Sequence, residues 1–389
     1  MSVVRIAQRL TIGGFMLLLI LPAVQKRYPF IHCPAVDENR KKYEKPVASM
    51  IEVLLNRHGA AAAYEKYYND HYGLRDLFIR VKNQIDYSVF CKSDKVHIGA
   101  DGWLFYRSVL DTEEPGVQRC LASQERDVPG ELDRIQEQLR RKGVTLVYVP
   151  CPQKNTVYPE LVPRSGPRRP QPLAYHRFCS AIQRDRQIMY IDAFETLMKL
   201  KRQYPVYYRT DFHWNEVAGY FIGKEIVEQI GRREGTIPRY YPLEIELRPY
   251  SGDQALFLPM LWTPAEEAPF LVKKCDDEGS YETLSNSLRG LWFRYRNYKK
   301  GVLPPVVVYG DSFQDSLIAS GFQCYFKEVY RAHLNYTSFS KVVELLPPQV
   351  KYLVVVHIEV AIPRVFAAHA PFEEEPTVVA AAPGKSTKQ

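Results

Sequence analysis

The stretch VVVYGDSFQDS, residues 306–316, decides how the rest of the chain is interpreted. A run of β-branched residues, typical of a buried strand, ends abruptly at Gly310-Asp311-Ser312, and polar residues follow. One interpretation is a turn after a strand that happens to contain a serine. The other is a serine nucleophile held at the end of a sheet, and that interpretation requires a base elsewhere in the chain.

Other apolar runs repeat this pattern, and stretches with helical spacing separate them. The predicted strands cover residues 144–150, 188–192, 324–330 and 352–358, and the predicted helices cover residues 127–142, 173–185, 214–230 and 337–346. Strands that alternate with helices are typical of a parallel sheet covered on both faces. We therefore predict an α/β fold in which Ser312 follows the carboxyl end of a strand, the edge where ligands bind. Residues 145–150, 188–192 and 352–357 are expected beside that strand.

The best candidate for the base lies in YYRTDFHWNEVAGY, residues 207–220, on a loop before a predicted helix. Asp211 and His213 are two residues apart, a spacing at which the carboxylate can reach the imidazole and fix its tautomer. The alternatives are a helix N-cap or Asx-turn for Asp211 and a surface position for His213. Together with Ser312, these two residues form the predicted catalytic set.

Two other histidines, His333 and His357, are rival bases. His357 lies at the end of an apolar strand, so we expect a core histidine whose ring nitrogens are satisfied. His333 lies in a predicted loop, where exposure to solvent is the expectation. Neither position favours a general base.

The segment PCPQKNTVYPE, residues 150–160, also follows the end of a predicted strand. Its Lys154 and Tyr158 would line the site if the segment faces it, or the segment would be a structural turn fixed by its prolines. With Trp214, which directly follows His213, Lys154 and Tyr158 form the predicted substrate-binding set.

The composition is that of a globular protein with a basic balance. Of 389 residues, 46% are hydrophobic and 25% charged, and the formal net charge is +8. The basic residues are scattered and no zinc-finger, RNP or helix-turn-helix signature occurs, so nucleic acid is not a predicted partner. An acidic polysaccharide, a membrane surface or plain solubility remain as explanations of the charge. The seven cysteines lie far apart without a Cys-x-x-Cys pair, and we predict neither a metal nor a cofactor.

The N-terminus carries the pattern of an export signal. Arg5 and Arg9 precede an apolar stretch, residues 10–24, that is marginal for a membrane span and long enough for the core of a signal peptide. A buried core helix is the alternative. Residues 1–25 are therefore predicted to be a signal peptide or membrane anchor, and residues 26–95 a linker and a helical segment.

Six sequence blocks together resemble a known family. They are YEKYYNDHYGLRDLFI (64–79), VHIGADGWLFY (96–106), VYVPCPQKNTVYPELVP (147–163), YRTDFHWNEVAGY (208–220), SGDQALFL (251–258) and VVVYGDSFQDS (306–316). In this order they resemble the SGNH-hydrolase-like proteins of the alginate O-acetyltransferase group, also called DHHW-type proteins. The resemblance implies an SGNH-hydrolase-like three-layer sandwich with a mostly parallel sheet over residues 96–368. A tail over residues 369–389, which we expect to be disordered, would follow it.

The resemblance also implies an activity. It makes Asp211, His213 and Ser312 the triad of a periplasmic O-acetyltransferase that moves acetyl groups onto hydroxyls of an exported, alginate-like polysaccharide through an acetyl-serine intermediate. The implied partners are the exopolysaccharide, a membrane-bound O-acyltransferase that supplies acetyl, and the inner membrane, in which residues 10–24 would anchor the chain. A carbohydrate acetylesterase and a noncatalytic polysaccharide-binding subunit of a secretion complex are the alternatives. Only the noncatalytic alternative expects the three side chains to lie apart.

Overall fold

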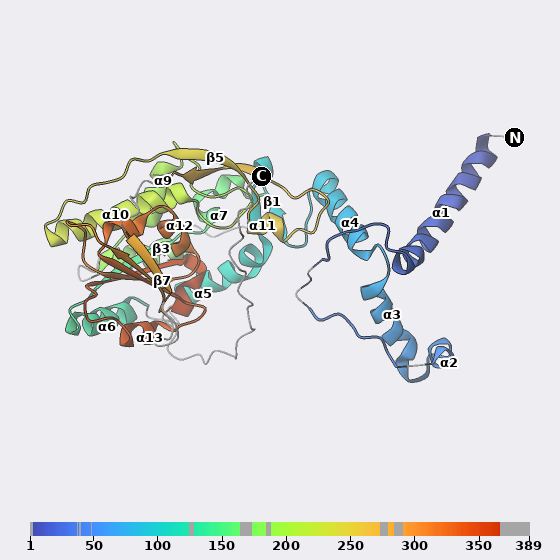
Figure 1. The fold of residues 1–389 in the computed structure, drawn as a ribbon, viewed down its shortest axis with the longest axis horizontal. Coiled ribbons are helices and arrows are strands. Elements are labelled where there is room, and N and C mark those ends of the chain that lie inside the picture. The colour runs from blue at the N-terminus through green and yellow to red at the C-terminus, as the bar shows by residue number, and fades with distance from the viewer. Residues whose placement is uncertain are drawn as a thin grey trace.

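The computed structural model describes residues 3–36, 38, 40–47, 49–123, 128–163, 173–183, 188–272, 279–283 and 291–365. The predicted tail, residues 369–389, lies outside the described residues. Figure 1 shows a domain built on a sheet, with the N-terminal helices extending from one side of it.

A seven-stranded sheet forms the centre of the large domain (Figure 1). Its strands, in spatial order, are β4 (Met189–Tyr190), β3 (Thr145–Cys151), β11 (Tyr352–Ile358), β9 (Val306–Gly310), β10 (Glu328–His333), β8 (Leu291–Asn297) and β7 (Gly279–Thr283). Neighbours from β4 to β10 are parallel, whereas β8 and β7 extend the sheet in the antiparallel direction. The predicted α/β fold is confirmed, with an antiparallel extension that the sequence pattern does not predict.

The alternation of side chains along the strands builds two hydrophobic cores, one on each face of the sheet. In β9, Val306 and Val308 belong to one core, and Val307 and Tyr309 belong to the other. The first core also contains residues of α9 (Ala193–Leu200), α10 (Glu216–Glu234) and α12 (Phe313–Ala319), and the second contains residues of α6 (Val128–Arg141), α8 (Ala174–Gln183), α13 (Phe339–Glu344) and α14 (Ile362–Val365). Because both faces are covered, every position of the strand favours an apolar residue, which explains the uninterrupted run at 306–309.

The order of the strands places the carboxyl ends of three of them together. Strand β9 pairs directly with β10 and β11, and Gly310 lies opposite both His333 and Val356. Of the three stretches expected beside β9, only residues 352–358 touch it, while β3 and β4 lie one and two strands beyond β11. Ser312 therefore follows a central strand, at the edge where β9, β10 and β11 end.

Two hairpins and three short helices lie outside the main sheet. The hairpins pair β1 (Val96–Ile98) with β2 (Leu104–Tyr106) and β5 (Ile245–Tyr250) with β6 (Glu266–Leu271), and the helices are α5 (Glu114–Ser123), α7 (Lys154–Val157) and α11 (Asp253–Leu256). Residues of β2, α7 and α11 line a pocket together with Ser312. These peripheral elements thus complete the site that the sheet begins.

The N-terminal part consists of α1 (Val3–Arg27), α2 (Met50–Leu54), α3 (Ala60–His71) and α4 (Arg75–Phe90) (Figure 1). Within the described residues, one helix is long and apolar enough to cross a membrane: residues 5–27, with a mean hydropathy of 1.6 and 6% burial. This helix extends beyond the predicted apolar core, residues 10–24, at both ends. Because it is almost entirely exposed, the alternative of a buried core helix is wrong.

Candidate active site

The strand that carries Ser312 stops where it does for two local reasons. A Cβ on Gly310 would lie 1.6 Å from the carbonyl oxygen of Val356, so only glycine allows β11 to approach this closely. The carboxylate of Asp311 then accepts hydrogen bonds from the backbone N–H groups of Phe313 and Ile358, both at 2.9 Å. The small residue and the acid therefore fix the turn that places Ser312 before α12.

The imidazole of His213 connects Ser312 to Asp211. Its Nε2 lies 2.6 Å from Ser312 Oγ, and its Nδ1 lies 2.8 Å from Asp211 Oδ1. The backbone N–H of His213 also donates to Asp211 Oδ1, at 3.2 Å, so the Asp-x-His spacing closes a tight local loop. A pairing of Tyr207 with Trp214 brackets this loop. Three side chains from two distant parts of the sequence thus form one continuous hydrogen-bonded chain.

The charges of Asp211 and His213 stabilise each other. Burial alone would raise the pKa of Asp211, but hydrogen bonds from His213 and Tyr250 and the charge of His213 hold it well below its usual range. Burial alone would lower the pKa of His213, yet the hydrogen bond and charge of Asp211 raise it above its ordinary value of 6.5. Asp211 is therefore ionised, and it stabilises a proton on His213.

Residues 250–255 pack against Asp211 and supply donors to its second carboxylate oxygen, Oδ2. The hydroxyl of Tyr250 donates to Asp211 Oδ2 at 2.7 Å, and the backbone N–H of Asp253 donates to the same oxygen at 3.2 Å. The N–H of Gly252 donates to Thr210 Oγ1 at 3.0 Å. A Cβ on Gly252 would lie 2.4 Å from Asp211 Cβ, so this approach requires glycine. The sequence marks this segment through SGDQALFL, but nothing in it identifies Tyr250 as a partner of Asp211.

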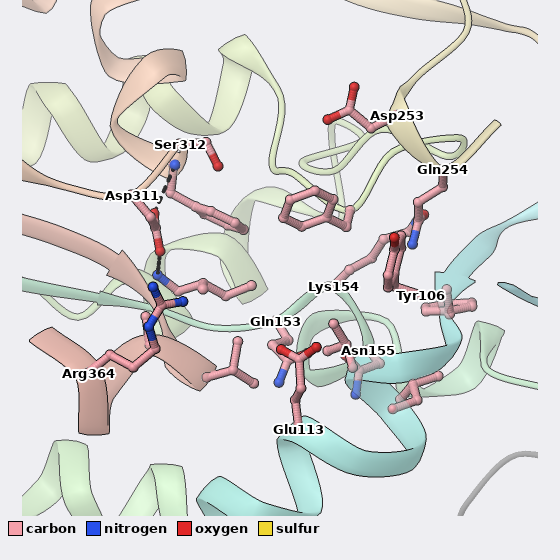
Figure 2. A pocket seen from close by; sticks show the side chains of 18 of the residues that line it. Tyr106, Glu113, Gln153, Lys154, Asn155, Asp253, Gln254, Asp311, Ser312 and Arg364 are labelled. Carbon is pink, nitrogen blue, oxygen red and sulfur yellow. Dashed lines mark hydrogen bonds between the residues drawn. The ribbon is translucent and has the colours of Figure 1, made fainter. Parts of the chain in front are cut away.

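A pocket of about 420 Å³ opens in front of Ser312 (Figure 2). Figure 2 shows Arg364 on one side of it, and Tyr106, Asp253 and Gln254 on the other. This volume is within the range of small-molecule sites, and Ser312 is one of the residues that line the pocket. The pocket thus gives Ser312 access to a ligand.

Residues 96–290 match the family described as "SGNH hydrolase-like domain, acetyltransferase AlgX". The chain belongs to this family. It is 28% identical over 203 residues to the probable alginate O-acetylase AlgJ of Pseudomonas syringae pv. tomato, covering 51% of this chain and 50% of the relative. It is 29% identical over 211 residues to the probable alginate O-acetylase AlgJ of Pseudomonas aeruginosa, covering 51% of this chain and 50% of the relative. The chain spans about half the length of these curated relatives.

Among solved structures, the O-acetyltransferase domain of Pseudomonas putida AlgJ aligns with a TM-score of 0.47 and 19% sequence identity. The alignment covers 69% of this chain and 92% of that chain. The match to the AlgX family contains Asp211 and His213 but ends at residue 290, before Ser312. The pairing of Ser312 with His213 is therefore an observation of this structure.

Lys154, predicted to bind substrate, lines the pocket, but the main chain holds its ammonium group. Its ammonium group donates to the backbone carbonyls of Leu104, Arg209 and Asp211, at 2.6, 2.8 and 2.8 Å. Burial lowers its pKa to about 7. Although Lys154 contributes to the pocket wall, its donors are directed at the main chain. It ties β2 to the loop that carries Asp211, and its contact with substrate stays a prediction.

The other two predicted substrate-binding residues also lie in the core. Trp214 is fully buried, and its Nε1 donates to the carbonyl of Phe313 at 2.9 Å. Tyr158 is 7% exposed, and its hydroxyl accepts from the N–H of Val206 at 3.1 Å. Both side chains are engaged away from the pocket. Trp214 instead links the histidine loop to Phe313, the residue after Ser312.

The two rival histidines differ from each other. His357 is fully buried, its Nε2 lies 3.0 Å from the hydroxyl of Tyr148, and burial lowers its pKa to about 4, which confirms the expected core histidine. His333 is not in an exposed loop as predicted. It ends β10, is partly buried and lines the pocket, with its Nδ1 accepting from the N–H of Asn335 at 3.1 Å. His213 remains the histidine that contacts Ser312.

Backbone N–H groups after Ser312 are mostly committed elsewhere. The N–H of Phe313 donates to Asp311 Oδ1, and the N–H of Gln314 donates to the carbonyl of Asp311 at 3.2 Å. Among the described residues, none accepts a hydrogen bond from the N–H of Ser312 itself. Any backbone stabilisation of an oxyanion at this turn would therefore come from Ser312 and not from the residues that follow it.

Proposed function

We propose that this chain is an O-acetyltransferase that moves acetyl groups onto hydroxyls of an exported polysaccharide. The observation that carries the proposal is the hydrogen-bonded chain from Ser312 Oγ through His213 to Asp211, at 2.6 and 2.8 Å, beside a pocket. A serine hydroxyl is a weak nucleophile until a held base accepts its proton, and this geometry supplies both the base and its orienting acid. The names of the AlgJ relatives support acetyl transfer to alginate as the reaction class.

The mechanism has two steps. His213 Nε2 accepts the proton of Ser312 as Oγ attacks the carbonyl carbon of an acetyl ester or thioester, and the same proton then goes to the leaving group. This leaves an acetyl-serine. In the second step His213 accepts the proton of a sugar hydroxyl, the sugar oxygen attacks the acetyl-serine, and the proton returns to Ser312. Asp211 stays ionised throughout and holds the imidazolium that forms in each step.

The negative oxygen of each tetrahedral intermediate requires donors. The N–H of Ser312 is the backbone candidate, and one donor of this kind contributes about 3–4 kcal/mol to the transition state. If water replaces the sugar in the second step, the same residues hydrolyse acetyl esters. Acetylesterase activity is therefore the background reaction of the proposed enzyme, and transfer depends on an acceptor that excludes water from the pocket.

The location and partners are part of the same proposal. An exposed apolar helix, residues 5–27, precedes the folded domain, and it would carry the chain to the periplasm as a signal or hold it in the inner membrane. A membrane-bound O-acyltransferase would then supply acetyl at that membrane, and the exopolysaccharide would accept it. A reporter fused after residue 60 should be active in the periplasm, and activity confined to the cytoplasm would contradict export.

Turnover of a chromogenic acetyl ester, with and without oligosaccharide, tests the catalytic proposal. We expect the wild-type chain to release the chromophore and to acetylate the oligosaccharide, detected as a mass increase. Ser312→Ala should lower both reactions by at least about a thousand-fold. A chain that folds and turns over the ester equally well without the Ser312 hydroxyl would show that the proposal is wrong.

A further inference from the structure

The pocket is lined by aromatic rings and by two carboxylates, of which Asp253 lies near His213. The ring of Phe212 lies 3.8 Å from the imidazole of His213, measured between centroids. The ring of Tyr106 meets Phe212 and Phe257 edge-on, at 6.3 and 6.0 Å. Asp253 and Glu113 line the same pocket (Figure 2). We call Tyr106, Glu113, Phe212, Asp253 and Phe257 the acidic aromatic wall.

The carboxylates of this wall have no lysine or arginine partner in the described ranges, and the cationic neighbour of Asp253 is the ring of His213, within 4.8 Å. In the described ranges, neither Glu113 nor Asp253 makes an ion pair. Both charges act on the hydroxyl of Tyr106, whose pKa is raised first by burial and then by Glu113 and Asp253. The ammonium of Lys154 is directed at main-chain carbonyls, and Figure 2 shows Arg364 on the opposite side from Asp253. The wall is therefore a local region of negative charge in a protein whose net charge is +8.

This arrangement suits one class of sugar. Aromatic rings pack against the apolar C–H face of a pyranose, and ionised carboxylates accept hydrogen bonds from its hydroxyls. A uronate placed against the same wall would bring its own carboxylate close to Asp253 or to Glu113 in a partly desolvated site, which disfavours binding. A sugar hydroxyl bound beside Phe212 would also lie next to His213, the proposed base.

We propose that the acidic aromatic wall is the acceptor subsite and that it selects a neutral hexose unit over a uronate. The inference rests on the proposed function for its acceptor role, and it departs from the polyuronate in the names of the AlgJ relatives. Alginate units are all uronates, so the acceptor of this chain would be a different exopolysaccharide, or one in which neutral units alternate with charged ones.

Binding to the full chain carrying Ser312→Ala tests selectivity without requiring turnover. The probes are cellotetraose and a mannuronate tetrasaccharide, compared by calorimetry at neutral pH and low ionic strength, where charge effects are largest. We expect cellotetraose to bind at least about ten-fold more tightly, since like charges in close contact are strongly disfavoured. Adding Glu113→Gln, or in a second variant Asp253→Asn, should raise the affinity for the uronate and narrow this ratio. Glu137→Gln on α6 changes the net charge equally, outside the pocket, and should leave the ratio unchanged.

The outcomes are distinct. Equal or tighter binding of the uronate, or no binding of either probe, overturns the inference. It is also overturned if Glu113→Gln and Asp253→Asn, each confirmed to be folded by circular dichroism, leave the ratio where it was. Failure of the proposed function gives a different result. If the wild-type chain binds cellotetraose selectively but shows no ester turnover that depends on Ser312, the subsite inference stands and the catalytic proposal is wrong.

Discussion

The contact between Tyr250 and Asp211 gives the sharpest test of how this site works. Tyr250→Phe removes one hydroxyl, the donor at 2.7 Å from Asp211 Oδ2, and keeps the ring that packs on Tyr208 and Phe270 at 4.6 and 5.7 Å. Tyr250 is not expected to touch the reacting atoms. Its role would be to position the carboxylate that positions His213.

The expected loss follows from the contacts that remain. A hydrogen bond to a charged group contributes about 1.5–3 kcal/mol, which corresponds to about 10- to 150-fold in rate if the whole of it is felt in the transition state. Asp211 Oδ2 keeps the N–H of Asp253 at 3.2 Å, and Oδ1 keeps the ring of His213 at 2.8 Å. Because these contacts still hold the carboxylate of Asp211, we expect the lower end of this range of rate effects, a fall in kcat of about ten-fold.

The pH profile of ester turnover distinguishes positioning from a general loss of structure. His213 acts as a base only when neutral, and its pKa lies above 6.5, so activity should fall as the pH drops through that pKa. Asp211→Asn removes the negative charge that raises the pKa, so this acid limb should move to lower pH while the plateau rate falls. Tyr250→Phe leaves the charge and removes a competing donor, so its limb should stay in place or move to higher pH.

Two results would refute this account of Tyr250. One is an unchanged kcat in a folded Tyr250→Phe chain, which would mean that Asp211 does not depend on the hydroxyl. The other is an acid limb that moves to lower pH, as in Asp211→Asn. Tyr208→Phe is the matched control, because it removes a hydroxyl from a ring that packs against Tyr250, and it should leave both kcat and the limb close to those of the wild type.

Three further predictions follow from the packing around the site. His213→Ala should lower kcat about as much as Ser312→Ala, and the double variant should lose little more, because the groups act as a unit; single-turnover kinetics measure this. Gly252→Ala should cost about 1–3 kcal/mol in the free energy of unfolding and lower kcat, since a Cβ there lies 2.4 Å from Asp211 Cβ; urea titration checks the first and ester turnover the second. Lys154→Met should cost about 1–3 kcal/mol in urea titration because it leaves buried carbonyls unpaired, and an unchanged midpoint would contradict the structural role of the ammonium.

The parts of the site that local sequence determines are the parts that could be predicted. The run at 306–309 is apolar at every position because both faces of its strand are covered, and Gly310 ends it because β11 passes too close for a side chain. The Asp-x-His spacing is equally local, since Asp211 reaches both the ring and the backbone N–H of His213. Once both segments are placed at the carboxyl edge of a parallel sheet, their meeting follows from topology.

The contacts of the predicted substrate-binding residues have a common physical feature, which is that a side chain near a site need not point at it. Lys154 follows the end of a strand, but its ammonium group donates to the carbonyls of Leu104, Arg209 and Asp211. No local sequence pattern predicts these partners. Trp214 is next to His213, yet neighbouring residues on this loop face opposite ways and its ring enters the core. Such contacts depend on how distant segments pack, which the pattern of one segment does not encode.

The catalytic residues and the proposed acceptor subsite come from different parts of the fold. Ser312 depends on the end of β9, and its contact with His213 is set by the main sheet and by the loop that Trp214 ties to Phe313. The acidic aromatic wall comes instead from β2, the π-helical segment Val109–Glu113, the residue before His213 and the segment around α11. Substitutions of Glu113 or the ring of Tyr106 would change the surface offered to a sugar without altering a hydrogen bond of the catalytic chain. At Glu113 and Tyr106, the proposed acceptor site can therefore change without a change in the proposed chemistry. Family membership indicates the chemistry, and the charges of this pocket would decide which acceptor binds.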